Sequence, residues 1–82
     1  IRAFPNPTSG NFTLEGDLQR AGQVEVVVRD LTGRVVGQTG QWVAAPQAFA
    51  QSVDLSGLSK GLYLYEVRYN SQSVYAGKVQ KE

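Results

Sequence analysis

The sequence predicts an all-β fold, a small antiparallel β-sandwich of the immunoglobulin-like kind with about seven strands. Apolar residues recur with a period of two, turn residues interrupt the chain at regular intervals, and no stretch has the i, i+3, i+4, i+7 repeat of an amphipathic helix. Nine glycines and several β-branched runs also disfavour helix, so we expect helix to be nearly absent. A small barrel is the competing architecture.

The clearest strand signal lies in the sequence "QVEVVVR". Val24, Val26 and Val28 alternate with Gln23 and Glu25, which is typical of a strand with one buried face, although another valine blurs the polar side.

Shorter segments show the same alternation between glycines, asparagines and serines. Phe12 and Leu14 alternate with polar residues, and Phe49, Val53 and Leu55 fall on one parity of their segment. The stretch "GRVVGQTGQWV" carries an apolar pair between glycines. Each segment predicts a short strand.

The last quarter of the chain predicts a β-hairpin. In "GLYLYEVRYN", Tyr63, Tyr65, Val67 and Tyr69 share a face, and the polar residues 70–73 then separate this segment from "VYAGKVQK".

The final segment, "AGKVQKE", indicates a closing strand rather than a frayed end. If Val74 and Ala76 pack in the core, Lys78 lies on the inward side near the rim and Lys81 lies on the opposite side. The residues alone favour an edge strand that ends in solubilising lysines.

Two similar tetrapeptides, "DLTG" at 30–33 and "DLSG" at 54–57, predict turns between strands. An Asp at the first position of a type I turn accepts hydrogen bonds from the backbone ahead of it, and Gly at the fourth tolerates a positive φ. The sequences differ from the Asp-Thr/Ser-Gly of aspartic proteases by an inserted leucine, so we interpret them as turns.

Length and composition predict a single domain over residues 1–82. A net charge of +1 argues against a general attraction to nucleic acid or to anionic membranes. No apolar run approaches the roughly 20 residues of a transmembrane helix, so we expect no direct membrane insertion. Because the chain starts with Ile1 rather than Met, we interpret it as part of a longer protein.

The residues predict no enzyme, cofactor or metal site. The chain has no Cys and no His, and its carboxylates are scattered without the ladder that binds calcium. Ser59 and Lys60 are adjacent and would point apart in an extended chain, so a turn is the better interpretation. An alternative function is a carbohydrate-binding or adhesion module, in which Trp42 and the tyrosines form a stacking platform. Use of most tyrosines in the core is favoured, because little else is large enough to fill it.

Four separated pieces resemble, in the same order, the C-terminal sorting domain of proteins exported by the type IX (Por) secretion system. They are "FPNPTSGNFTL", "VVVRDLTGRVV", "VDLSGLSKGLYLYEV" and "AGKVQKE", and together they extend from Phe4 to Lys81. The prolines of "PNP" fix φ and remove backbone donors, which suits the junction between a passenger linker and the sandwich.

The resemblance implies a secretion signal that directs a passenger protein, in cis, across the outer membrane of a Gram-negative bacterium. The passenger would reach the periplasm first, outer-membrane translocon components would recognise the folded domain, and a sortase-like peptidase would typically remove it upstream. The product would be secreted or held at the cell surface. An unpaired edge strand would also allow dimers.

The resemblance also implies candidate recognition residues. Gly61 and Tyr63 match the family's Gly-x-Tyr, and Lys78, Val79 and Lys81 match its terminal basic strand. The chain departs from the pattern in Phe4, where tyrosine is usual, and in Glu82, which makes the end less basic.

Overall fold

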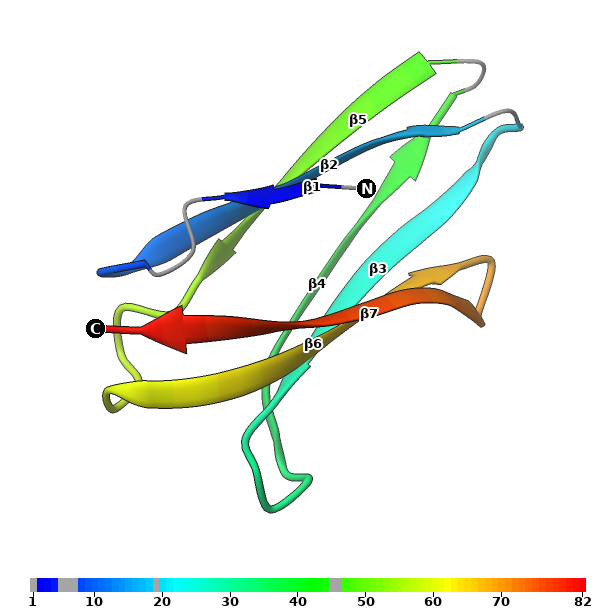
Figure 1. The fold of residues 1–82 in the computed structure, drawn as a ribbon. Helices are drawn as coiled ribbons and strands as arrows, with labels where there is room; N and C mark the ends of the chain where they lie inside the picture. Colours follow the sequence, from blue (N-terminus) through cyan, green and yellow to red (C-terminus); the bar gives the residue numbers. More distant parts are fainter. Residues whose placement is uncertain (1, 5–7, 19, 45–46) are drawn as a thin grey trace.

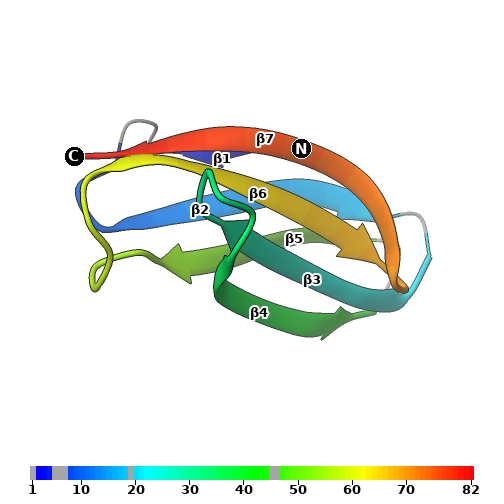
Figure 2. The ribbon, with the colours of Figure 1, turned by 90° about the horizontal axis from the view of Figure 1, so that it is seen from below.

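The fold is a sandwich of two antiparallel sheets, seen in a computed structural model that describes residues 2–4, 8–18, 20–44 and 47–82 (Figures 1 and 2). The strands are β1 (Arg2–Phe4), β2 (Asn11–Leu18), β3 (Gly22–Arg29), β4 (Val35–Val43), β5 (Gln47–Asp54), β6 (Gly61–Tyr69) and β7 (Gln72–Lys81). One sheet has the order β1-β2-β5 and the other the order β4-β3-β6-β7. The predicted all-β sandwich is confirmed, and the described residues contain no helix.

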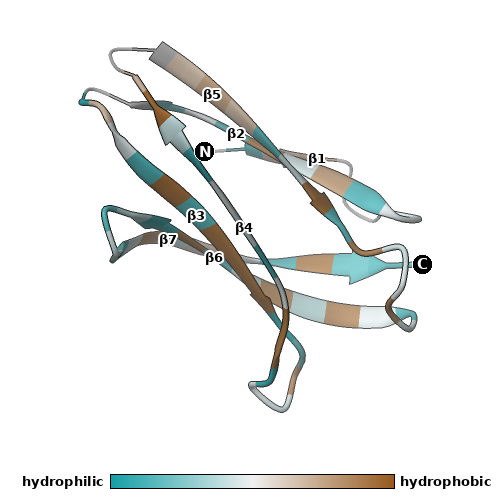
Figure 3. Cartoon of the chain, turned by 180° about the vertical axis from the view of Figure 1, so that it is seen from behind, coloured by the Kyte–Doolittle hydropathy of each residue, from teal (hydrophilic) through white to brown (hydrophobic). Residues whose placement is uncertain are grey.

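The core lies between the sheets, because each inner strand turns alternate side chains inward. Hydrophilic and hydrophobic residues accordingly alternate along the first part of β3 (Figure 3). The inward residues predicted from the alternation are buried: Phe12, Leu14, Val24, Val26, Val28, Phe49, Val53 and Leu55. Leu58 packs against this core from the loop that follows β5.

Two tyrosines of β6 depend on glycines in the neighbouring strands. Tyr65 lies opposite Gly77, and a Cβ atom added at Gly77 would stand 2.5 Å from the Tyr65 hydroxyl oxygen. Likewise, a Cβ added at Gly22 would stand 2.3 Å from Cε1 of Tyr69. Glycine at these two positions therefore makes the room in which the rings lie.

The β6–β7 hairpin has the predicted polar turn, but its register differs from the prediction. Asn70 and Ser71 both have positive φ, 49° and 70°, as a two-residue turn of a hairpin requires. An irregularity between Val67 and Arg68 then shifts the pairing, so that Val67 lies opposite Tyr75 rather than Val74.

This bulge exchanges the two faces of β7. The condition considered from the sequence, that Val74 and Ala76 pack in the core, is therefore not met, since Val74 is 53% exposed and Ala76 is exposed. The inward positions are instead those of Val79 and Lys81, whereas Lys78 is exposed.

Both tetrapeptide turns form as predicted in their main feature. Oδ1 of Asp30 accepts hydrogen bonds from the backbone amides of Thr32 (2.9 Å) and Arg34 (3.1 Å). Oδ1 of Asp54 accepts one from the amide of Ser56 (2.8 Å). The expected positive φ is found at Gly33 (92°).

Gly57 does not have the expected positive φ. The chain there turns over residues 55–58 instead, where the amide of Leu58 donates to the carbonyl of Leu55 at 3.0 Å. The positive φ in this loop occurs at Gly61 (146°), where β6 begins.

The N-terminal part of the chain contacts both sheets. Phe4 pairs with Thr13 in the three-stranded sheet, whereas Thr8 forms a parallel bridge with Lys81 in the four-stranded sheet. The strand β1 was not anticipated from the sequence, and the prolines of "PNP" lie outside the described residues. The two sheets are thus joined next to the C-terminus.

Candidate recognition site

The five residues singled out from the sequence come together where β6 begins and β7 ends. Gly61 lies opposite Lys81, Tyr63 opposite Val79, and Lys78 opposite Leu64. The C-terminus lies at the same end of the molecule as the start of β2 and the start of β6 (Figures 1 and 2). The five residues therefore form one region of the hairpin, although they do not share one face.

Tyr63 and Val79 belong to the core. Val79 is fully buried, and Tyr63 is buried with its hydroxyl group donating a hydrogen bond to the carbonyl of Ser59 at 2.7 Å. This bond satisfies the only polar atom of the side chain and holds the loop before β6 against the strand. A partner that approached the folded domain from outside would not meet these two side chains.

Lys81 is buried as well, with 8% of its surface exposed. Its ammonium Nζ donates a hydrogen bond to the carbonyl of Leu58 at 2.9 Å, so its stem covers the core and its charged end ties the β5–β6 loop to the last strand. The lysine that the sequence placed away from the core is therefore the one that packs inside.

The segment before β2 holds the C-terminus from the other side. The amide of Thr8 donates to the carbonyl of Gln80, and the amide of Glu82 donates to the carbonyl of Thr8, both at 2.8 Å. Thr8 is itself buried, and its hydroxyl donates to the carbonyl of Asn11 at 2.5 Å. The end of the chain is thus part of the folded structure and not a tail.

Of the five predicted residues, Lys78 alone has a largely exposed side chain. It lies on the outer face of the four-stranded sheet, directly opposite Leu64, which is 39% exposed. On its other side Leu64 lies opposite Arg29 of β3. A partner could therefore contact Lys78 together with Leu64 and Arg29.

The carboxylate of Glu66 is held by three groups on the same outer face. Arg29 (3.3 Å) and Arg68 (3.0 Å) both form ion pairs with its Oε1 atom. The hydroxyl of Ser73, followed by the two guanidinium groups, lowers the pKa of Glu66 below its ordinary value of 4.5. The negative charge of Glu66 is thus already paired within the protein.

We expect the stability of the domain to fall when the pH drops below about 4.5. Since folding lowers the pKa of Glu66, its contribution is complete above the unfolded value and is lost as the pH falls through the folded value. The lowered pKa values of Asp30 and Asp54 act in the same direction at still lower pH. Melting temperatures measured from pH 7 to pH 3 check this, and Glu66→Gln should make the fall between pH 5 and pH 3 shallower. An unchanged slope in that variant would contradict the role given to Glu66.

The aromatic residues do not form the stacking platform considered from the sequence. Tyr63 and Tyr65 are buried inside the sandwich, whereas Trp42 is 66% exposed and pairs with exposed Gln23 on the outer side of β3 and β4. The rings thus lie on opposite faces of one sheet. In the part of the chain that the structure describes, no ring contact joins Trp42 to another aromatic side chain.

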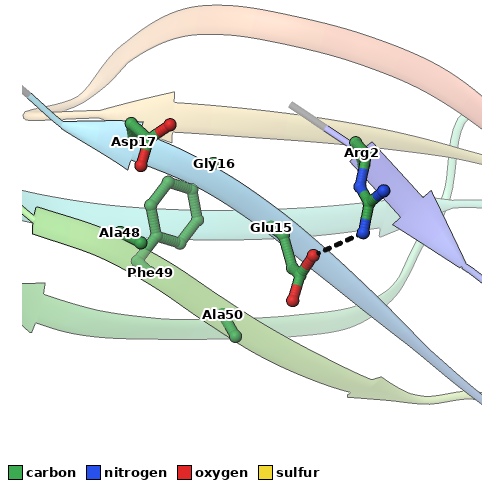
Figure 4. A pocket seen from close by; sticks show the side chains of 7 residues that line it. All are labelled: Arg2, Glu15, Gly16, Asp17, Ala48, Phe49 and Ala50. Atoms are coloured by element: carbon green, nitrogen blue, oxygen red, sulfur yellow. Dashed lines mark hydrogen bonds and ion pairs between the residues drawn. The ribbon is translucent and has the colours of Figure 1, made fainter.

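A hollow of about 440 Å³ lies on the three-stranded sheet. Its lining includes Ala48 and Ala50 on β5, with Glu15 and Arg2 forming an ion pair at 2.9 Å beside them (Figure 4). Across residues 2–4, 8–18, 20–44 and 47–82, no group of three or more acidic side chains is placed to hold a metal ion. None of these residues belongs to a helix that could cross a membrane.

Sequence reasoning missed two features of the site. Thr8 gave no signal, because a threonine after proline is unremarkable until the fold brings it to the C-terminus. Leu64 and Arg29 also went unnoticed, although the polar parity of β6 and β3 places both on an outer face. The presence of leucine at an outward position was the available signal.

Fold and site together define a small β-sandwich domain whose C-terminal strand is held near its end along both edges, by β6 and by Thr8, and carries an exposed cationic side chain. Over residues 2–82 the sequence matches the family described as secretion system C-terminal sorting domain. The chain belongs to this family, and it is a C-terminal sorting signal for the type IX secretion system. No curated protein and no solved structure matches the chain.

Membership of this family implies an interaction with the type IX secretion machinery and a passenger in cis. It also implies that the cargo is secreted or displayed at the cell surface. Sorting domains of this family are not catalytic.

Proposed function

We propose that residues 1–82 form a single C-terminal sorting domain of a larger secreted protein, and that the machinery recognises this domain in its folded form. Outer-membrane translocon components bind it after the passenger has reached the periplasm. A sortase-like peptidase then cuts upstream of the domain and frees the passenger. The domain itself is a substrate and not an enzyme.

The anchored C-terminal strand is the observation that supports recognition of the folded form. Thr8 binds Gln80 and Glu82 through backbone hydrogen bonds of 2.8 Å, and Lys81 binds Leu58. Thr8 is 73 positions and Leu58 is 23 positions from Lys81 in sequence, so the end of the strand takes its position only when the sandwich has formed. Recognition of that strand would therefore select cargo whose sorting domain has folded.

Within the five candidate residues we propose two different roles. Four of them position the end of β7. Gly61 provides the bend at the start of β6, Tyr63 and Val79 pack in the core, and Lys81 donates a hydrogen bond to Leu58. Lys78 is the residue that the translocon contacts directly, because its side chain is exposed.

The edge of β7 that faces away from β6 also offers a route to dimers. Along most of its length β7 pairs with β6 on one side, and its other edge has the parallel bridge to Thr8 near the end. An edge with unpaired backbone groups can pair with the same strand of a second copy. Sedimentation at two or more concentrations distinguishes such a dimer from a monomer.

The central experiment fuses these 82 residues behind a periplasmic reporter in a strain with an active type IX system. We expect the reporter in the medium or on the cell surface, and we expect it in the periplasm when the system is inactivated. A folded fusion that stays in the periplasm of the competent strain would contradict the proposed function. Sequencing the new N-terminus of the freed domain locates the cut relative to Ile1.

A further inference from the structure

The outer faces of the two sheets carry different charges. The strands of the three-stranded sheet hold three carboxylates, Glu15, Asp17 and Asp54, against the single guanidinium of Arg2. All four of these side chains fall on the outward parity. The outer face of the four-stranded sheet carries three cations against two carboxylates, listed by strand as Glu25, Arg29, Glu66, Arg68 and Lys78.

On the four-stranded sheet, apolar and cationic side chains alternate along one line across all four strands. Val35 of β4 lies opposite Arg29 of β3, Arg29 lies opposite Leu64 of β6, and Leu64 lies opposite Lys78 of β7. We call these four residues the Leu64 row. Its apolar members are both exposed, Val35 by 48% and Leu64 by 39%.

The residues next to the Leu64 row, Glu66 and Val27, add neither an unpaired negative charge nor exposed apolar surface to it. Glu66 stands next to the Leu64 row, but Ser73, Arg29 and Arg68 already satisfy its carboxylate. The outward-facing Val27 beside it is only 3% exposed, because polar side chains such as Glu66 and Gln38 lie on either side. Next to Glu66 and Val27, the exposed apolar surface therefore lies in the Leu64 row, whereas the exposed Trp42 (66%) and Val74 (53%) lie farther along the same sheet, beside Gln23 and Ser73.

We propose that the Leu64 row is the surface through which the domain docks on a protein of the secretion machinery. The matching surface of that partner protein has apolar side chains bordered by carboxylates. Apolar residues between flanking charges match a protein interface with a hydrophobic centre and a charged rim. An anionic membrane is a poorer match, since stable electrostatic binding to lipid uses clusters of about 4–8 basic residues. The inference rests on the proposed function, which it extends by naming the contact surface.

The test compares secretion of the reporter fusion for two variants of the Leu64 row with two matched controls. Leu64→Ser removes the apolar contact, and Lys78→Glu reverses a flanking charge. Phe4→Ser changes an apolar side chain of nearly equal exposure, 40%, on the other sheet, and Arg20→Glu reverses a charge in the exposed loop after β2. We expect each variant of the Leu64 row to reduce export at least tenfold and to accumulate in the periplasm, and each control to be exported like the unmodified fusion.

The outcomes separate the two proposals. If the unmodified fusion is not exported, the proposed function fails. If that fusion is exported and the Leu64 row variants are exported equally well, the docking surface is wrong while the function stands. Thermal melts of the purified fusions test whether loss of fold is the cause of reduced export. Because all four substitutions are at exposed positions, we expect unchanged melting temperatures. Binding of the purified fusion to vesicles of anionic phospholipid, if abolished by Lys78→Glu, would overturn a protein partner in favour of lipid.

Discussion

Deletion of Val79–Glu82 is expected to destabilise the whole domain, so that loss of export in such a truncation would not identify a signal. The deletion removes a fully buried valine and the hydrogen bond of Lys81 to Leu58. It also removes both backbone hydrogen bonds to Thr8. If Val79 and Lys81 acted only as recognition residues, as the family resemblance implies, the deletion would instead stop export and leave the sandwich folded.

The size of the effect follows from the groups lost. Burial of a valine side chain contributes about 1.5–3 kcal/mol, and each of three hydrogen bonds contributes about 0.5–1.5 kcal/mol. The sum, about 3–7.5 kcal/mol, is comparable with the roughly 4–12 kcal/mol expected for the free energy of unfolding of a chain this long. We therefore expect the truncated domain to lose a large part of its free energy of unfolding and, toward the lower end of this range, all of it.

Urea denaturation of the full and truncated domains measures this loss directly. Lys78→Ala is the matched control, since it alters an exposed residue of the same strand and should change the free energy of unfolding by less than about 0.5 kcal/mol. A truncated domain with the same unfolding midpoint as the full chain would show that the C-terminal contacts do not stabilise the fold.

Gly77→Ala is expected to lower the free energy of unfolding by about 1–3 kcal/mol through overpacking. The added methyl group would lie 2.5 Å from the Tyr65 hydroxyl oxygen and 2.6 Å from its Cζ atom. The Tyr65 ring has little room to move, because it is buried and lies against the Phe12 ring, with 5.6 Å between their centroids. Either this ring or the β7 backbone must shift.

The control for this substitution is Gly57→Ala. A methyl group there meets no atom within 4 Å, and the backbone φ is not in the left-handed region. We expect that variant to be unchanged or more stable by about 0.4–1 kcal/mol. Equal stabilities for the two alanine variants, measured in the same urea titration, would refute the contact between Gly77 and Tyr65 as the cause.

The inner strands, which have a neighbouring strand on each side, could be predicted from the sequence because their hydrophobic alternation is strong. Val24, Val26 and Val28 needed no tertiary information, since a period of two with one apolar parity has a single sensible interpretation. The short β1 escaped prediction because three residues are too few for a pattern. The loop at Gly57 differed because its turn depends on the positions of Leu55 and Leu58, which pack in the core.

The sequence by itself determined the class of fold, the order of the turns and, through four ordered motifs, the family. It also located the five candidate residues at the β6–β7 hairpin. Only the tertiary structure decided which of them face outward, because one bulge at Val67 exchanges the faces of β7 and buries Lys81 while exposing Lys78. A bulge places two residues of one strand opposite one residue of its partner. Neither the composition nor the alternation of the β7 sequence marks where this happens. The contact of Thr8 with the C-terminus likewise joins residues more than 70 positions apart, which alternation along the chain does not encode.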